Sequence, residues 1–436
     1  MPRRYTAHPA DIVGYSRLAI DAVLGLTDLV EAEHHNISRA PSVFGRPAEG
    51  GLPGIPGFVY KSIRGVATLV GGGINAGLAP LLFAGGEARS TPEREAALAV
   101  LNGIVGEHLV ATGNPLAITM RLRRHGVPLE LHRDALLAAI PKVSSKLLVL
   151  VHGLGCNDLQ WLRMGHDHGQ ELSRELGYTT VYLHYNTGRH VSRNGRAFAN
   201  LLESLVREWP TEITELAILG HSMGGLVARS AYHYGCSANH RWPQYLRDLI
   251  FLGTPHHGAP LERWGNLLHV GLGLSPYTAA FARLGRIRSD GITDLRYGNL
   301  LDEDWKGSDR FAHRRDSRLP LQLPDAVNCY ALAALKAERS TAATLALGDG
   351  IVPVSSALGQ HKDPARTLAF PPGHQAVING ITHFDLLSDA AVHQQVRSWL
   401  ARRGKQRLRT KIVNKRALTG IPANPESTTP RRKKRS

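Results

Sequence analysis

Ser222 is the residue whose type and surroundings point most directly to chemistry. It is the centre of the sequence GHSMG at residues 220–224, which follows the charge-free apolar run 216–219 and precedes a run of good helix formers. Such an apolar run is typical of a strand buried on both faces of a parallel sheet. A strand followed by the pattern G-x-S-x-G and then by a helix predicts a turn so tight that glycines must flank the serine. This turn exposes the serine hydroxyl. The sequence therefore predicts a nucleophilic serine, with an ordinary glycine-rich turn as the alternative.

A serine hydroxyl needs partners before it can act as a nucleophile. A base must lie within hydrogen-bond reach, and a third group must orient that base. The oxyanion formed during acyl transfer needs fixed backbone N–H donors, each worth on the order of 3 kcal/mol. The chain has 22 histidines, so residue type alone does not identify the base. The base must therefore be identified from its place relative to the predicted strands and helices.

Alternating apolar runs and amphipathic stretches predict the elements around Ser222. The catalytic domain is expected to begin near residue 116, with a β-hairpin in which the runs 118–122 and 127–131 flank residues 123–126. Further strands are predicted at 146–151, 180–184, 216–219, 248–252, 326–332 and 367–370. Helices are predicted around 163–176, from an Asn194 cap to Trp209, after Ser222, and at 388–401. Strands that alternate with helices after an opening hairpin predict an α/β fold with a doubly wound, mostly parallel sheet.

Residues 1–115 precede this domain and are expected to form a helical extension. Asp11 is predicted to cap a helix that runs to about residue 30, and residues 96–111 are typical of another amphipathic helix. Residues 65–86 carry no charge over 22 positions, a length that would span a bilayer. Seven glycines in this stretch favour instead an apolar helical hairpin that packs on the catalytic domain or lies at a membrane surface. No secretory signal is evident in residues 1–40.

Size and composition indicate one large α/β domain with additions, since 436 residues that are 43% hydrophobic can bury an extensive core. The three cysteines, Cys156, Cys236 and Cys329, are widely spaced and form neither a disulfide framework nor a metal motif. They suit a reducing compartment. We therefore expect a cytoplasmic protein, with peripheral membrane contact as an option.

The basic charge of the chain is concentrated in its C-terminal tail. Residues 402–436 hold 13 Lys and Arg and one acid, Glu426, so they carry +12 of the net +16 and the other 401 residues carry +4. The basic tail, 403–436, also contains three prolines and is predicted to be disordered. It would contact anionic lipid head groups or bind nucleic acid non-specifically, with a solvated tail without a partner as the alternative. Because the tail lacks aromatic residues, no specific nucleic acid is expected.

Five motifs, one of which is the sequence around Ser222, reveal a family resemblance. They are VHGLG at 151–155, GHSMGG at 220–225, LGTPHHG at 252–258, GDGIVP at 348–353 and THFDLL at 382–387. With these motifs the chain resembles the α/β-hydrolase superfamily, of the lipase and esterase type. More narrowly, it is similar to the branch of GPI inositol-deacylase-like and bacterial triacylglycerol-lipase-like proteins. The resemblance covers about residues 116–402.

The resemblance implies a catalytic triad, because the chain order in this fold is serine, acid and histidine. It identifies Ser222 as the nucleophile, Asp349 as the acid and His383 as the base. Asp294 and Asp385 are the alternatives for the acid, and His374 is the alternative for the base. His221 is expected to take no part in proton transfer.

The resemblance also implies an oxyanion hole made by the backbone N–H groups of Met223 and Leu154. Gly153 would let the backbone approach the substrate closely. Trp161 would either line the acyl site or pack in the core. His256 and His257 are expected to shape the loop after the strand at 248–252.

Residues 258–324 are too many for an ordinary connection and mix apolar helix-like pieces with a charged stretch. We interpret them as a cap or lid over the active site, with an inert excursion as the alternative. In lipases such insertions shield an acyl groove, so a lipid-like ester would suit.

The expected function is a serine hydrolase that cleaves carboxylic esters, above all lipid esters, through an acyl-enzyme intermediate. The alternatives are an acyltransferase that uses the same triad and a catalytically inactive, membrane-associated scaffold. No metal and no organic cofactor is expected to be needed. The expected partners are a lipid or other ester substrate and an anionic membrane surface that the basic tail contacts.

Overall fold

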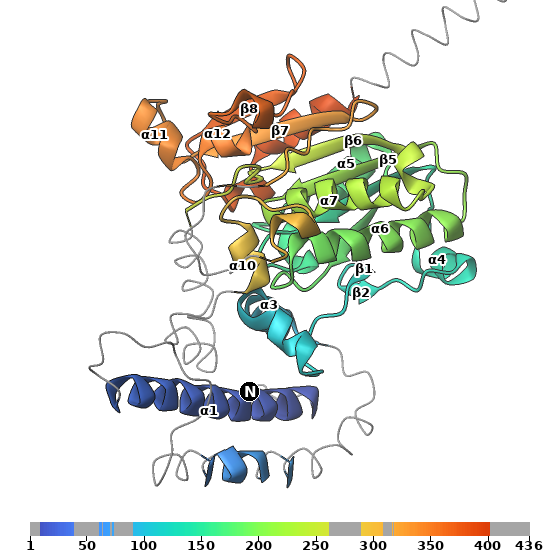
Figure 1. The fold of residues 1–436 in the computed structure, drawn as a ribbon. Coiled ribbons are helices and arrows are strands. Elements are labelled where there is room, and N and C mark those ends of the chain that lie inside the picture. Colours follow the sequence, from blue (N-terminus) through green and yellow to red (C-terminus); the bar gives the residue numbers. More distant parts are fainter. Residues whose placement is uncertain are drawn as a thin grey trace, which may run out of the picture.

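One sheet organises the part of the chain that the computed structural model describes, which comprises residues 9–38, 61–62, 64–69, 72–73, 90–260, 289–307, 316 and 318–401. Its strands are β1 (Arg121–Arg124), β2 (Val127–Pro128), β3 (Lys146–Val151), β4 (Thr179–His184), β5 (Glu215–His221), β6 (Leu246–Leu252), β7 (Asn328–Leu335) and β8 (Gln375–Asn379). Their order across the sheet is β2-β1-β4-β3-β5-β6-β7-β8 (Figure 1). The strands from β4 to β8 in this order run parallel, and β1 is antiparallel to both of its neighbours. The predicted mostly parallel sheet with an opening hairpin is confirmed.

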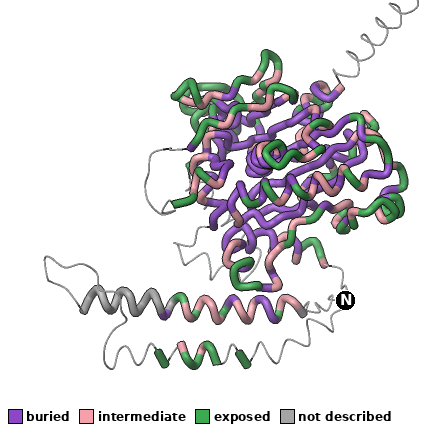
Figure 2. The backbone as a smooth tube through the Cα atoms, turned by 45° about the vertical axis from the view of Figure 1, so that its right-hand side comes forward, coloured by how far each residue is buried: buried purple, intermediate pink, exposed green. Residues whose placement is uncertain are grey.

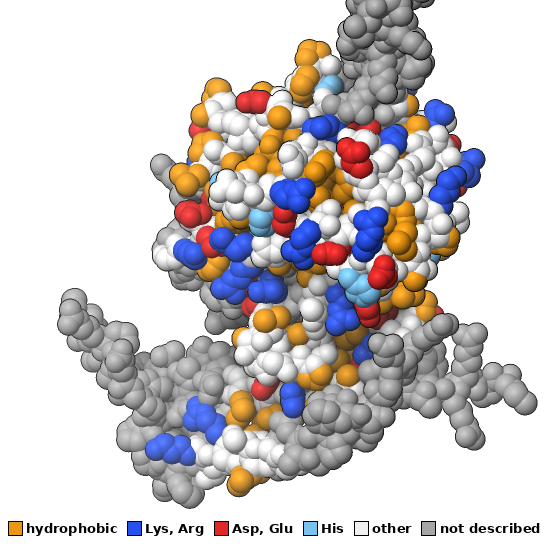
Figure 3. Space-filling view, turned by 90° about the vertical axis from the view of Figure 1, so that its right-hand side faces the viewer, with side chains coloured by type: hydrophobic (Ala, Val, Ile, Leu, Met, Phe, Trp, Pro, Cys, Tyr) orange, Lys and Arg blue, Asp and Glu red, His pale blue; other side chains and the backbone are white. Residues whose placement is uncertain are grey.

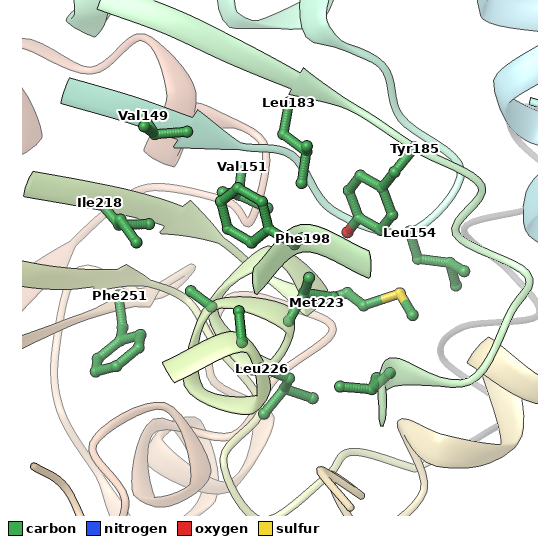
Figure 4. Close-up of a cluster of buried hydrophobic side chains, with 14 of the residues drawn as sticks. Val149, Val151, Leu154, Leu183, Tyr185, Phe198, Ile218, Met223, Leu226 and Phe251 are labelled. Atoms are coloured by element: carbon green, nitrogen blue, oxygen red, sulfur yellow. The ribbon is translucent and has the colours of Figure 1, made fainter. Parts of the chain in front are cut away.

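Helices cover both faces of this sheet. On one face α6 (Val191–Glu208) and α7 (Met223–Ser237) lie side by side (Figure 1). Phe198 and Leu226 of these helices pack on side chains from alternate strand positions, among them Val149 and Val151 of β3 (Figure 4). The intervening positions of β3 face a second cluster, formed with α5 (His168–Leu176) and a final helix at 390–401. Burial on both faces explains why the central strands are continuous apolar runs in the sequence.

The remaining helices lie at the ends and edges of this core. They are α1 (Pro9–Ser38), α3 (Pro92–Ala111), α4 (Arg133–Ala139), α10 (Asp290–Asp294), α11 (Ala342–Leu347) and α12 (Val354–Ala357). Figure 2 shows that buried positions alternate with more exposed ones along the described part of α1, whereas the central strands are buried throughout.

α3 is packed between α1 and the sheet (Figure 1). On the side of α1, Arg94 forms an ion pair with Asp11 at 2.6 Å, and His108 Nε2 lies 2.9 Å from Asp21 Oδ2. On the opposite side, the Asn102 side chain donates to the Leu116 carbonyl at 2.8 Å. Eleven of its 20 residues are buried, so α3 is part of the core rather than a surface helix with one apolar face.

Three details differ from the predicted elements. α1 begins at Pro9, so Asp11 lies in its first turn and binds Arg94 instead of capping the helix. α6 begins at Val191, and Asn194 lies inside it, where its side chain donates to the Asn186 carbonyl at 2.9 Å. The predicted last strand at 367–370 is wrong, because the chain pairs with β7 only after two consecutive prolines at 371–372, in β8.

Several predicted segments lie outside the described residues. These are the basic tail, residues 261–288, 308–315 and 317 of the expected cap, and the stretch 65–86 apart from 65–69 and 72–73. No helix in the described ranges is long and apolar enough to cross a membrane. On the face of the molecule in Figure 3, acidic side chains are scattered among the Lys and Arg side chains.

Candidate active site

Ser222 lies at the turn between β5 and α7, in a backbone conformation that non-glycine residues rarely adopt, with φ 54° and ψ −125°. The neighbouring glycines are sterically required. A Cβ on Gly224 would lie 2.2 Å from the Val151 carbonyl oxygen, and a Cβ on Gly220 would lie 2.7 Å from Gly225 Cα. The Ser222 N–H donates to the Leu252 carbonyl at 2.8 Å, which fixes the turn. The Ser222 hydroxyl is buried and has no hydrogen-bond partner among the described residues.

Asp349 and His383 are joined by a short hydrogen bond, with 2.6 Å between Asp349 Oδ2 and His383 Nδ1. Both side chains are buried. The other carboxylate oxygen, Asp349 Oδ1, accepts from the N–H groups of Ile351 at 2.9 Å and Val352 at 2.8 Å. Gly348 and Gly350, with φ 61° and φ 98°, form the turn that aims the carboxylate. One oxygen of Asp349 is thus held by the backbone, and the other is presented to the imidazole.

The His383 ring lies at the end of β6, beside the elbow. A Cβ on Gly253 would lie 3.2 Å from both Cε1 and Nδ1 of His383, and Gly253 directly follows the residue whose carbonyl accepts from Ser222. His221 Nε2 donates to the His383 carbonyl at 3.0 Å, and the two ring centroids are 4.7 Å apart. Burial, followed by the nearby His383, holds the pKa of His221 well below its ordinary value. His221 is therefore a neutral donor that positions the His383 loop.

The loop after β3 lies directly against Ser222. A Cβ on Gly153 would lie 2.9 Å from Ser222 Cβ and 3.4 Å from Ser222 Oγ. Within the described ranges, neither the N–H of Leu154 nor that of Met223 has a hydrogen-bond acceptor. The Leu154 and Met223 side chains lie in the apolar cluster shown in Figure 4, close to Tyr185. The arrangement leaves two backbone donors available beside the serine.

The alternative acids and the alternative base lie elsewhere. Asp294 accepts from the Val191 N–H at 2.7 Å and contacts His190 at 3.1 Å, so it holds the start of α6. Asp385 accepts from the backbone and hydroxyl groups of Thr382, at 2.9 Å and 2.6 Å, within its own turn. His374 precedes β8, stacks on the Tyr330 ring and contacts the Cys329 carbonyl at 3.0 Å.

The remaining predicted residues are structural or flank the site. His256 Nδ1 lies 3.2 Å from Arg229 Nη1, and His257 Nε2 donates to the Gly359 carbonyl at 3.0 Å, so both rings hold the loop after β6. Trp161 is only 1% exposed and packs edge-on against His221, with 6.4 Å between the ring centroids. Trp161 is therefore a core residue behind the elbow rather than a lining of an open acyl site.

The sequence did not reveal that α3 supports the loop at 153–156. Gly103 of α3 approaches this loop so closely that its Cβ would lie 3.1 Å from Gly155 Cα. A Cβ on Gly106 would lie 1.9 Å from Asn186 Oδ1, and the Asn186 side chain donates to the Gly106 carbonyl at 2.9 Å. The Gly155 N–H in turn donates to Thr187 Oγ1 at 3.0 Å. Two glycines three positions apart in a predicted helix were the available signal for such close packing.

His152, which begins this loop, gives the fold a dependence on pH. Burial lowers the pKa of His152 from 6.5 to about 3, so below pH 6.5 the unfolded chain takes up a proton that the folded chain does not. The resulting contribution to the free energy of unfolding is complete above pH 6.5 and is lost as the pH falls towards 3. The loss is no more than about 1.4 kcal/mol per pH unit. We expect urea unfolding between pH 7 and pH 4 to show a smaller loss of free energy of unfolding in His152→Gln than in wild type.

The control for this measurement is His132→Asn, since the His132 side chain is 60% exposed and asparagine keeps its capping role at α4. This variant should show the wild-type dependence on pH. Equal slopes for His152→Gln and wild type would contradict the prediction.

The strand order and the elbow are those of the α/β-hydrolase fold, and the resemblance inferred from the sequence is confirmed. More particularly, residues 143–316 match the model of the family described as the PGAP1-like alpha/beta domain. The match includes the elbow and the loop after β3, whereas Asp349 and His383 lie beyond it. No curated protein sequence matches the chain.

Three of the solved structures to which this chain is similar are a lipase, a phospholipase and an esterase. The mature lipase BlEst2 of Bacillus licheniformis is 18% identical, with a TM-score of 0.35 over 56% of this chain and 86% of that chain. Phospholipase PlaB of Legionella pneumophila is 17% identical, with a TM-score of 0.37 over 58% of this chain and 59% of that chain. An esterase of Pyrobaculum calidifontis is 13% identical, with a TM-score of 0.34 over 72% of this chain and 94% of that chain.

Proposed function

We propose that this protein is a serine hydrolase that cleaves carboxylic esters through an acyl-enzyme, with Ser222, His383 and Asp349 as its catalytic triad. The observation that carries the proposal is a strained, buried Ser222 whose neighbour His221 has its ring centroid 4.7 Å from that of His383, while His383 Nδ1 is bound to Asp349 at 2.6 Å. A nucleophile, a base and an orienting group in this relation are the components of triad catalysis. Backbone strain at a single serine is also typical of functional sites.

In the proposed reaction, Ser222 Oγ attacks the ester carbonyl carbon while His383 Nε2 takes the hydroxyl proton. Asp349 accepts from Nδ1–H, so Nε2 carries the lone pair that receives this proton. The N–H groups of Leu154 and Met223 stabilise the oxyanion of the tetrahedral intermediate. His383 then gives its proton to the leaving alkoxide, and the acyl group stays on Ser222. Water activated by His383 hydrolyses the acyl-enzyme and restores the triad.

We propose lipid esters as the substrate class. This is supported by the apolar side chains beside the elbow and by the position of α10, which lies within the expected cap. A Cβ on Gly291 of α10 would lie 3.1 Å from Met223 Cε, so this segment reaches the residue that follows the nucleophile. The basic tail would add attraction to anionic lipid head groups, at about 1 kcal/mol per Lys or Arg near the surface.

The test is hydrolysis of p-nitrophenyl esters with acyl chains from short to long by the purified full-length protein. We expect turnover on every chain length that dissolves, with kcat/KM increasing towards the longer chains. Turnover limited to the shortest esters would support ester hydrolysis but contradict a lipid substrate. No release of p-nitrophenol from any ester, with or without an added alcohol as acyl acceptor, would contradict the proposed function.

A further inference from the structure

Three histidines form a cluster on the face of the sheet that carries α5 and the helix at 390–401. His166 comes from the turn that leads into α5, His168 is the first residue of α5, and His393 comes from the final helix. One ring nitrogen of each lies within 4.8 Å of the corresponding nitrogens of the other two. His168 and His393 are buried, while His166 is partly exposed. The cluster is therefore nearly enclosed but open to solvent on one side.

The hydrogen bonds around the cluster orient two lone pairs towards its centre. His168 Nε2 lies 2.9 Å from the Leu386 carbonyl, which can only accept, so the proton is on Nε2 and the lone pair is on Nδ1. His393 Nε2 lies 3.2 Å from Glu175 Oε2, which places the lone pair of that ring on Nδ1 as well. His393 Nδ1 is buried and has no hydrogen-bond partner in the described part of the chain.

The third nitrogen, His166 Nε2, lies 2.8 Å from His168 Nδ1. With the lone pair on His168 Nδ1, His166 Nε2 must be the donor in this contact. For a cation at the centre to be bound by all three nitrogens, His166 would have to carry its one ring proton on Nδ1 instead of Nε2, which exchange with solvent at this partly exposed ring allows. Neutral imidazole is the form that binds metals.

We propose that His166, His168 and His393 bind one first-row transition-metal ion, of which Zn²⁺ is the expected example. Three imidazole nitrogens suit Zn²⁺, Cu²⁺ and Ni²⁺ rather than Mg²⁺ or Ca²⁺. With Zn–N bonds of about 2.0–2.1 Å, the nitrogens of a tetrahedral site lie about 3.3 Å apart, so small shifts, mainly of the partly exposed His166, complete the site. A backbone carbonyl and a carboxylate are the usual outer partners of metal-bound histidines, and Leu386 and Glu175 provide them here.

This metal site would join segments that are far apart in sequence. It connects the start of α5 to the final helix, and through His168 it reaches Leu386, three residues after His383. The ion would therefore brace the turn that follows His383 from outside the active site. The proposal does not depend on the proposed hydrolase function, because the metal takes no part in the ester reaction.

The test is a titration of Zn²⁺ into the tag-free, full-length protein after chelator treatment, with binding measured by isothermal titration calorimetry. We expect one equivalent of Zn²⁺ with Kd below about 1 µM and a higher Tm for the zinc-loaded protein. His166→Ala should raise Kd at least about 100-fold, and Glu175→Gln should raise it by about 10- to 100-fold. Co²⁺ should give the visible absorption of a four-coordinate ion in wild type but not in His393→Asn.

The control is again His132→Asn, which removes an exposed histidine outside the cluster and should keep the wild-type Kd. An unchanged Tm in chelator shows that each variant is folded, and His166→Ala decides the question if His393→Asn does not fold. The proposal is wrong if wild type binds no Zn²⁺ with Kd below about 100 µM. It is equally wrong if His166→Ala binds one equivalent with the wild-type Kd.

Discussion

Ser222→Ala should lower kcat for ester hydrolysis by about 10⁶, the loss seen when a triad serine is removed from a serine hydrolase. The variant retains the backbone donors at Leu154 and Met223 and the Asp349–His383 pair, so residual turnover reflects water attacking a bound ester. Alanine has the same Cβ as serine, so it meets the backbone conformation at φ 54° with no additional clash. Steady-state assays on the best p-nitrophenyl ester, with Tm measured in parallel, check this expectation.

The matched control is Ser237→Ala. Ser237 is the last residue of α7, the helix that begins beside Ser222, and its exposed hydroxyl donates only to the His233 carbonyl at 2.9 Å. This variant should keep wild-type kcat and KM. If Ser222→Ala retained a tenth or more of wild-type kcat while folded, another group would have to be the nucleophile.

How far the sequence predicts the site depends on how local each signal is. The elbow was predictable because the strand, the two glycines and the helix that define it lie within about 20 consecutive residues. Asp349 and His383 required the motifs and the chain order of a known fold, since residue type alone distinguishes neither of them from other Asp-Gly turns or from the other histidines. Asp294 remained an alternative for the same reason. Its partner His190 lies 104 positions away, so its structural role is visible only in the folded chain.

The last strand was predicted at 367–370 instead of at β8 for a physical reason. β8 is paired only with β7 and alternates between exposed and partly buried residues, so it lacks the continuous apolar run of the central strands. The residues at 367–370 resemble a strand more closely, but the prolines that follow them cannot donate to a sheet.

The histidine cluster was missed for a related reason. Only His166 and His168 are close in sequence, two positions apart, and the third member, His393, lies 225 positions after His168. A motif search for closely spaced cysteines and histidines therefore finds two ligands at most. The packing of α5 against the final helix brings the third member to them.

Asp349→Asn provides the most specific test of how the triad is arranged, and we expect it to lower kcat by about 10⁴ with little change in KM. Asp349 Oδ1 accepts from the N–H groups of Ile351 and Val352. The same two donors would hold the carbonyl oxygen of the new asparagine in that place, which turns its NH₂ group towards His383. An NH₂ group facing Nδ1 requires a lone pair there, so the proton moves to Nε2. The imidazole then presents a proton to Ser222 instead of a lone pair, and it cannot act as the base.

Asp385→Asn is the control for the acid, because Asp385 is the closest alternative in sequence to His383. It accepts from the N–H and hydroxyl groups of Thr382 through one oxygen, Oδ2, and an asparagine carbonyl can do the same. We therefore expect kcat and KM close to wild type in this variant. A large loss of kcat in Asp385→Asn, with activity retained in Asp349→Asn, would reverse the assignment. Because both changes replace one oxygen atom by nitrogen, the comparison separates the orientation of His383 from any general effect of removing a negative charge in this region.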